Sequence, residues 1–156
     1  MEQFYSQWLI NIAKDSAIYS DLVQKHGSIL ICDDMIITGY NHLNCSNHKS
    51  SISTHAEIDA ITKFIARCRL KYYDDKYIRK KLRKSILITV RVKNDAVRSS
   101  TPCRDCIEII KDYGIRQIIY STNTINNDDQ LIKKKIRELN NRPSSGYRWI
   151  ERITNR

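Results

Sequence analysis

Apolar residues recur at helical spacing at the start of the chain. Phe4, Trp8 and Ile12 follow one another at intervals of four residues, as in an amphipathic helix. The pattern predicts a helix over about residues 3–24, which we expect to end by Gly27 because helices commonly end at a glycine.

The pattern then changes to two short runs rich in β-branched residues. SILIC (28–32) and MIITGY (35–40) lie on either side of Asp33-Asp34 and predict a β-hairpin. The polar, turn-rich segment 41–53 follows, and it predicts a loop.

Helical and strand patterns alternate in the rest of the chain. A strand, a helix and a second strand in this order imply a crossover and parallel pairing in part of the sheet. We therefore expect one domain over residues 1–156, with a three-layer α/β/α fold around a central mixed sheet. The predicted elements are a helix from Thr54, a basic helix over 73–84, a strand over 86–92, a helix from Thr101-Pro102 to a stop at Gly114, a strand over 115–121 and a helix over 127–140.

Composition is typical of a folded protein without a membrane partner. Hydrophobic residues make up 41% of the chain, and no apolar run approaches the roughly 20 residues that span a bilayer. The start, MEQFYSQWLI, has neither the basic region nor the cleavage site of a signal peptide. We therefore expect an intracellular, cytoplasmic protein whose five cysteines are reduced thiols or metal ligands.

Positive charge is concentrated in one segment. The chain has a formal net charge of +10, and residues 61–93 hold twelve Lys or Arg against only Asp74 and Asp75. Such a segment favours polyanions, among them nucleic acid and phosphorylated small molecules. A solvated helix face explains the same charges, and both interpretations stay open.

Two cysteines lie at the start of a predicted helix. Cys103 and Cys106 follow a proline in a P-C-x-x-C pattern, where the helix dipole lowers the thiol pKa and favours thiolates. Two thiolates at this spacing can bind one soft metal ion, but they leave a tetrahedral zinc short of ligands. The other helix start, His55-Ala56-Glu57, offers an imidazole and a carboxylate.

These two motifs together resemble the H-x-E and P-C-x-x-C signature of the cytidine and deoxycytidylate deaminase superfamily, which also includes the tRNA adenosine deaminases. The resemblance covers most of the chain, from the hairpin to the last helix. It implies a cytidine-deaminase-like domain in which His55, Cys103 and Cys106 bind Zn²⁺, a water takes the fourth position, and Glu57 is the catalytic acid and base.

Each of these residues also has a structural interpretation. Thr54 and Glu57 fit a capping box at the helix start. His55 can also be explained as a hydrogen-bonded polar residue beside the core. Cys103 and Cys106 can also be explained as small apolar side chains that pack in the core. Their joint occurrence between the predicted strand and helices favours the zinc site.

Further residues are candidates for contact with a substrate. The G-x-N stretch that ends at Asn41 resembles one in the family, which implies that Asn41 contacts the sugar, and the resemblance also implies that the backbone N–H of Ala56 contacts the base. Asn41 fits a turn-forming residue as well. Tyr120 and Ser121, at the end of a strand, are candidates for lining the site or for packing.

A second metal cluster is a candidate in the loop. Cys45 and His48, with His42 nearby, carry metal-binding side chains at a spacing that fits no firm zinc pattern. If Cys45 or His48 closed the fourth position of the first site, the protein would be a catalytically silent zinc module.

The leading interpretation is an enzyme that acts on a free cytosine nucleotide. We expect hydrolytic deamination of a (deoxy)cytidine nucleotide such as dCMP, giving the uracil product and ammonia, in a homo-oligomer as is usual in the family. His55 stands where plain cytidine deaminases more often carry a cysteine. The alternative is a cytidine or adenosine deaminase of RNA or single-stranded DNA, in which the basic segment 61–93 follows the backbone and its tyrosines stack on bases.

Overall fold

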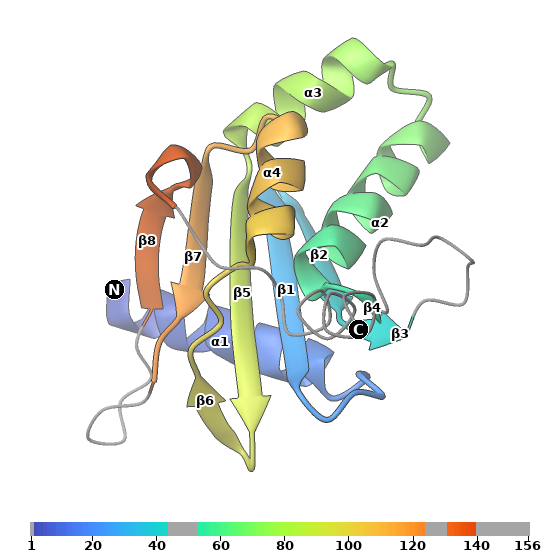
Figure 1. Ribbon diagram of the computed structural model, residues 1–156. Coiled ribbons are helices and arrows are strands. Elements are labelled where there is room, and N and C mark those ends of the chain that lie inside the picture. Colours follow the sequence, from blue (N-terminus) through green and yellow to red (C-terminus); the bar gives the residue numbers. More distant parts are fainter. Residues whose placement is uncertain (1, 44–52, 124–130, 140–156) are drawn as a thin grey trace, which may run out of the picture.

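The computed structural model describes residues 2–43, 53–123 and 131–139, with side chains from residue 7 on. Helices and strands follow one another as the α/β pattern predicts (Figure 1). The elements are α1 (Glu2–Ala17), β1 (Lys25–Cys32), β2 (Met35–Tyr40), β3 (His42–Leu43), β4 (Ser53–Thr54), α2 (Ala56–Leu70), α3 (Asp75–Lys84), β5 (Ile86–Lys93), β6 (Ala96–Arg98), α4 (Arg104–Asp112), β7 (Gln117–Ser121), β8 (Leu131–Lys135) and a 3₁₀ turn (Ile136–Glu138).

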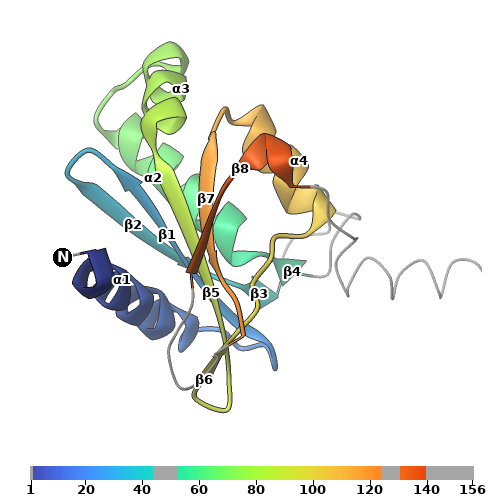
Figure 2. The same cartoon turned by 90° about the vertical axis from the view of Figure 1, so that its left-hand side faces the viewer.

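The main sheet is mixed and lies between two helical layers. Its strand order is β2-β1-β5-β7-β8, and β6 pairs with β5. β5 and β7 are parallel, whereas β1 pairs antiparallel with both β2 and β5, and β7 pairs antiparallel with β8. α1 covers one face, and α2 and α4 lie on the other (Figures 1 and 2). The predicted three-layer fold and the predicted hairpin around Asp33-Asp34 are confirmed.

A hydrophobic core fills the space on each side of the sheet. The larger core joins the α2, α3 and α4 side to alternate strand residues such as Leu30, Leu87 and Ile118. The smaller core joins α1 to the intervening strand residues, including Ile29 and Ile88. This alternation is the side-chain period of a β-strand, and it fixes which residues of each strand face the helix starts discussed below.

The first helix is shorter than predicted. It ends at Ala17, and Gly27 lies inside β1 instead of ending the helix. A Cβ atom on Gly27 would lie 1.8 Å from the carbonyl oxygen of Ala13, so the glycine permits the close approach of α1 to β1. Ile10 and Ala13 form the buried face of the helix, whereas Trp8 is 45% exposed.

The helix predicted over 127–140 is wrong in its described part. Leu131–Lys135 forms β8, and Ile136–Glu138 forms the 3₁₀ turn. β8 pairs along the whole of β7, which would otherwise present an unpaired edge. Strand pairing has therefore overridden the helical propensity of the lysine-rich sequence.

The structure bears on the expected absence of a membrane span and on the expected state of the cysteines. No helix among the described ranges is long and apolar enough to cross a membrane. The four described cysteines are free thiols, and Cys32 and Cys68 lie in the core as small apolar side chains.

Candidate metal centre

Two helix starts converge on the same side of the sheet. His55 is the N-cap of α2 and Cys103 is the N-cap of α4, both with extended backbone conformations. The α4 helix begins at Arg104, two residues later than predicted, so Pro102 precedes the cap. The Cys103 side chain accepts a hydrogen bond from the backbone N–H of Cys106, three residues on, which holds the Cys103 sulfur atom beside the first turn of α4.

The three predicted ligands meet in space. The His55 Nδ1 atom lies 3.1 Å from the Cys106 Sγ atom and 3.5 Å from the Cys103 Sγ atom. All three ligand atoms lie within 4.8 Å of one another. Zinc bonds of about 2.3 Å to sulfur and about 2.0–2.1 Å to nitrogen, at tetrahedral angles, separate nitrogen from sulfur by about 3.6 Å. The donor set and its spacing therefore fit a zinc ion.

The three groups share protons through hydrogen bonds with one another. Hydrogen bonding from Cys106 lowers the pKa of Cys103 to about 4, and His55 acts in the same direction. The hydrogen bond to Cys103 raises the pKa of His55 to about 9. Hydrogen bonding to Cys103 also raises the pKa of Cys106. Because a cation displaces such shared protons, metal binding here releases protons and strengthens as pH rises.

Glu57 is buried beside the three ligands. Glu57 is only 4% exposed to solvent. This burial raises the pKa of its carboxyl group, although the charge of His55 acts in the opposite direction. The charge of Glu57 in turn raises the pKa of both His55 and Cys106. A carboxyl group with a raised pKa beside a candidate metal centre is suited to accept and return a proton.

The capping-box interpretation of Glu57 does not hold. With His55 as the N-cap, Glu57 occupies the second helical position, whereas a capping box uses the third. The cap of α2 has no side-chain hydrogen bond. Glu57 is therefore not a capping-box residue, although its carboxylate accepts from its own backbone N–H.

The second candidate metal cluster falls mostly outside the described residues. Cys45 and His48 lie there, so the structure does not place them relative to the first site. Among the described residues, the one group able to hold a metal ion is that of His55, Cys103 and Cys106.

The two predicted substrate residues, Ala56 and Asn41, are both buried but lie in different elements of the fold. Ala56 is fully buried at the first position of α2. Asn41 is also buried: its side-chain oxygen accepts from the His26 N–H at 2.8 Å and its side-chain nitrogen donates to the Gln24 carbonyl oxygen at 2.6 Å. The Asn41 side chain thus fixes the start of β1 against the segment after β2.

Tyr120 and Ser121 also lie within packed or hydrogen-bonded structure. Tyr120 joins the larger core. The hydroxyl group of Ser121 donates to the Arg98 carbonyl oxygen at 2.7 Å and lies 2.8 Å from the Ser100 hydroxyl oxygen. Ser100 Oγ donates in turn to the Thr89 carbonyl oxygen at 2.7 Å. These bonds hold the segment that leads into Cys103, a role that the sequence pattern did not reveal.

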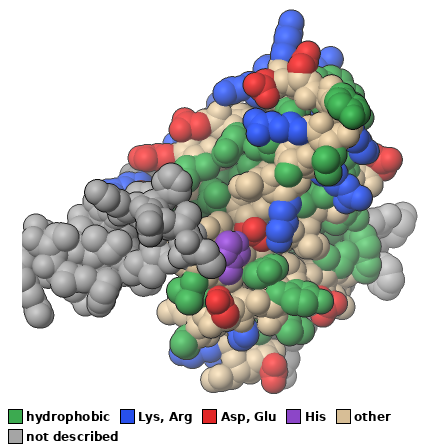
Figure 3. All heavy atoms as spheres, turned by 90° about the vertical axis from the view of Figure 1, so that its right-hand side faces the viewer, with side chains coloured by type: hydrophobic (Ala, Val, Ile, Leu, Met, Phe, Trp, Pro, Cys, Tyr) green, Lys and Arg blue, Asp and Glu red, His purple; other side chains and the backbone are tan. Residues whose placement is uncertain are grey.

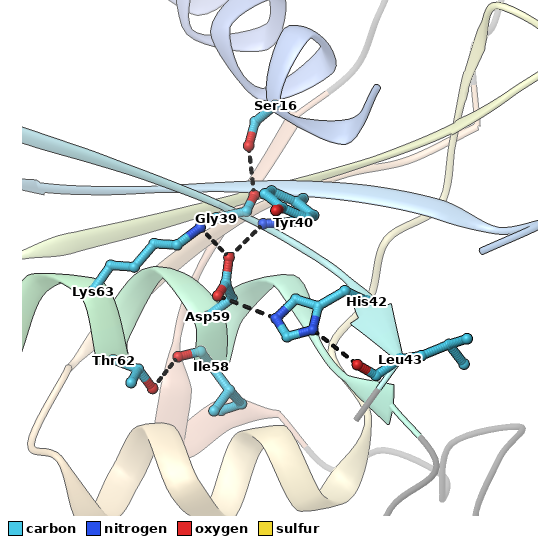
Figure 4. Close-up of polar contacts among 9 residues, drawn as sticks. All are labelled: Ser16, Gly39, Tyr40, His42, Leu43, Ile58, Asp59, Thr62 and Lys63. Carbon is cyan, nitrogen blue, oxygen red and sulfur yellow. Dashed lines mark hydrogen bonds and ion pairs between the residues drawn. The ribbon is translucent and has the colours of Figure 1, made fainter. Parts of the chain in front are cut away.

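Asp59 links α2 to the segment around β2 and β3 (Figure 4). Its carboxylate accepts from the Tyr40 backbone N–H at 3.0 Å and from the Lys63 ammonium group at 2.6 Å, and it lies 3.3 Å from the His42 Nε2 atom. Asp59 is not among the residues that the sequence motifs indicate. The signal was available, because an acid on the buried stripe of a helix requires polar partners.

The basic helix lies far from the metal centre. α2 has His55 at its start and leads to α3 at its other end, and a helix of 15 residues spans about 22 Å. Lys and Arg side chains lie along the α2–α3 side of the molecule, interspersed with hydrophobic and acidic ones (Figure 3). The cations of α3 are therefore beyond contact with a small molecule at the metal centre.

Comparison with known proteins identifies the family. The family model described as the cytidine and deoxycytidylate deaminase zinc-binding region matches residues 2–122. The chain belongs to this family. No curated protein matches the sequence.

Solved structures share the fold at low sequence identity. A cytidine deaminase from Burkholderia pseudomallei is 16% identical with a TM-score of 0.59, and the match covers 85% of this chain and 93% of that one. One from Bacillus anthracis is 17% identical with a TM-score of 0.52, covering 97% and 94%. One from Mycobacterium tuberculosis is 15% identical with a TM-score of 0.53, covering 85% and 91%. The fold is that of the cytidine deaminases.

Proposed function

We propose that this protein is a zinc-dependent hydrolytic deaminase of cytosine in a (deoxy)cytidine nucleotide such as dCMP, which releases uracil nucleotide and ammonia. The observation that carries the proposal is the meeting of His55, Cys103 and Cys106 beside the buried carboxyl group of Glu57. The matched structures are named cytidine deaminases, which favours cytosine as the base.

The proposed mechanism divides the work between the metal and Glu57. His55, Cys103 and Cys106 would hold the zinc ion, which would supply a Lewis acid able to lower the pKa of a bound water from about 15.7 toward about 7. Glu57 accepts one proton from the water as the water oxygen bonds to C4, and it delivers this proton to N3. It then takes the remaining proton from the new C4 hydroxyl group and delivers it to the amino group, which leaves as ammonia when the C4–N4 bond breaks. Its raised pKa supports both steps, because the carboxylate must take up a proton as well as release one.

We retain Ala56 and Asn41 as substrate-binding candidates. Ala56 follows the ligand His55 directly, so its backbone lies beside the metal centre. The Asn41 side-chain oxygen accepts one described hydrogen bond, and an amide oxygen has two lone pairs. One acceptor position is therefore available for a sugar hydroxyl group.

We also propose a homo-oligomeric, cytoplasmic protein. Ile18, Tyr19 and Val23 are large apolar side chains exposed to solvent after α1, which supports contact with another subunit. The four free thiols among the described residues support a reducing compartment.

A substrate panel tests the proposed reaction. Zinc-loaded protein is incubated with cytidine, deoxycytidine, CMP, dCMP, adenosine and AMP, and ammonia release is measured. We expect ammonia from the cytosine compounds, with dCMP or CMP as the best substrate. Release from the adenine compounds alone, or from none of the six, would overturn the proposal.

A further inference from the structure

Two arginines lie opposite each other on the face of the sheet that carries the metal centre. Arg91 of β5 pairs in register with Arg98 of β6. On β5, Leu87 faces the core of α2 and α4, whereas Ile88 and Val90 face α1. Because strand side chains alternate and directly opposite residues share a face, both arginines project on the α2 and α4 side.

Neither guanidinium group is neutralised within the described residues. Among the described residues, the ion pairs involve other cations, and neither arginine side chain forms a hydrogen bond. The Arg91 Nε atom is buried without a hydrogen-bond partner. Like charges directly opposite on neighbouring strands repel, and a buried donor without an acceptor is unfavourable. The pair therefore has the chemistry of a site for an anion.

His26 joins the arginine pair to the segment that carries Asn41, because its backbone N–H donates to the Asn41 side-chain oxygen at 2.8 Å. His26 of β1 is opposite Arg91 in register, on the same face. Burial lowers the pKa of His26 to about 4, and the charges of His55 and Arg91 act in the same direction. His26 is thus within electrostatic reach of a metal ligand on one side and of the arginine pair on the other.

Other nearby cations are already engaged. Lys63 donates to Asp59 and lies 4.5 Å from the centre of the Tyr40 ring. Arg104 lies 3.9 Å from the carboxylate of Asp105. The basic helix α3 follows the far end of α2, a helix about 22 Å long that has His55 at its start. Arg91 and Arg98, in contrast, form no ion pair among the described residues, and they lie directly opposite each other in the sheet.

We propose that Arg91 and Arg98 form a phosphate subsite of the active centre, so that the protein acts on a cytosine nucleoside monophosphate in preference to the free nucleoside. Arginine suits this role because its planar group donates two parallel hydrogen bonds to one phosphate. A bound phosphate also relieves the repulsion between the two guanidinium groups. The inference rests on the proposed function and adds the part of the substrate that the protein recognises.

The ratio of kcat/KM for dCMP to kcat/KM for deoxycytidine tests the subsite. We expect Arg91→Gln to lower this ratio by about 10- to 100-fold, as charge-assisted hydrogen bonds to the phosphate are lost. Arg98→Gln should lower it in the same direction. Arg79→Gln, on exposed α3, removes the same charge far from the site and should keep the ratio within about threefold of wild type.

Two outcomes would overturn the subsite. One is a ratio unchanged in both Arg91→Gln and Arg98→Gln; the other is a ratio that falls as far in Arg79→Gln, which would indicate a general effect of charge. If Arg91→Gln does not fold, Arg91→Lys replaces it in the same kcat/KM comparison, because a lysine keeps the charge and loses the paired donors. We expect a fall in the ratio in this variant too, and an unchanged ratio would contradict paired recognition.

Failure of the proposed function is distinguishable from failure of the subsite. If wild-type protein releases no ammonia from either compound, the deaminase proposal fails. Calorimetry with dCMP and zinc-loaded protein then still tests the subsite through the dissociation constant of dCMP. We expect dCMP to bind wild-type protein at least tenfold more tightly than it binds Arg91→Gln. Equal binding would contradict the subsite independently of turnover.

Discussion

Glu57 shows how one residue can be tested apart from the metal ligands beside it. It lies in the first turn of α2, two residues after His55, and it is buried without a capping role. Its carboxyl group perturbs the pKa of both His55 and Cys106, so it is close enough to serve the same centre. In the proposed function, Glu57 transfers protons and takes no part in holding zinc.

Replacing Glu57 with alanine should separate these two roles. We expect Glu57→Ala to retain one zinc per chain, because the three ligands are intact, and to lose about 10²- to 10⁴-fold in kcat, because the proton carrier is gone. Zinc content by mass spectrometry and ammonia release are measured on the same preparation. Loss of zinc together with activity would show that Glu57 supports the structure of the centre instead.

At the residue scale, the sequence predicted the residues that lie in short motifs. His55, Glu57, Cys103 and Cys106 occur at fixed spacings at two helix starts, and the structure brings the three ligand residues together. Arg91 was indicated only as one of the twelve cations of segment 61–93, because its pairing with Arg98 depends on which residue lies opposite in the sheet. Cross-strand register is a long-range property that no local pattern contains.

At the scale of elements, the position of α2 on β2 determines where His55 and Glu57 lie. Gly39 of β2 faces α2 at very short range: an added Cβ would lie 2.4 Å from the Ala60 nitrogen and 2.6 Å from the Ala56 oxygen. Both neighbours are helix backbone atoms, so they cannot turn aside as a side chain could. The carbonyl oxygen of Gly39 also accepts a hydrogen bond from Ser16 on the opposite face, at 2.7 Å.

Gly39→Ala should therefore destabilise the protein by displacing α2. We expect a loss of about 2 kcal/mol in the free energy of unfolding, the range typical of overpacking, and a fall in Tm of about 4–8 °C. Thermal unfolding measures both. Thr38→Ala, on the exposed side of the same strand, should cost less than about 1 kcal/mol. Equal Tm values for the two variants would contradict the close contact.

The elements that were predicted correctly are those with strong local patterns. The hairpin has a two-residue turn between β-branched runs, and β5 is a continuous β-branched run. The sequence of β8, LIKKK, has no such pattern, and it is a strand because β7 needs a partner along its edge. Pairing partners, like the close approach of α1 that Gly27 permits, are set by tertiary structure.

At the scale of the whole molecule, the basic helix and the metal centre are separate. A free nucleotide at the metal centre cannot reach the cations of α3, whereas a single strand of RNA or DNA is long enough to follow α2 from one to the other. The double variant Arg79→Gln, Lys80→Gln should therefore leave dCMP turnover unchanged. Ammonia release from dCMP measures this, and a substantial loss would contradict the distance.

The same variant distinguishes the nucleic-acid alternative. If RNA or single-stranded DNA is the substrate, binding of an oligonucleotide should weaken steeply with salt, and removing two cations should reduce the slope of log K against log salt by about 1.4. Fluorescence anisotropy over a salt series gives this slope. A flat salt dependence would support the free nucleotide.

The central claim is that His55, Cys103 and Cys106 hold one zinc ion on which deamination depends. The most direct measurement follows zinc content and ammonia release together, in wild-type protein before and after chelation and in Cys103→Ala. We predict one zinc per chain and activity in wild type, loss of both on chelation, recovery of both when zinc is returned, and loss of both in Cys103→Ala. Undiminished ammonia release by zinc-free protein, or a full zinc complement in Cys103→Ala, would contradict the account.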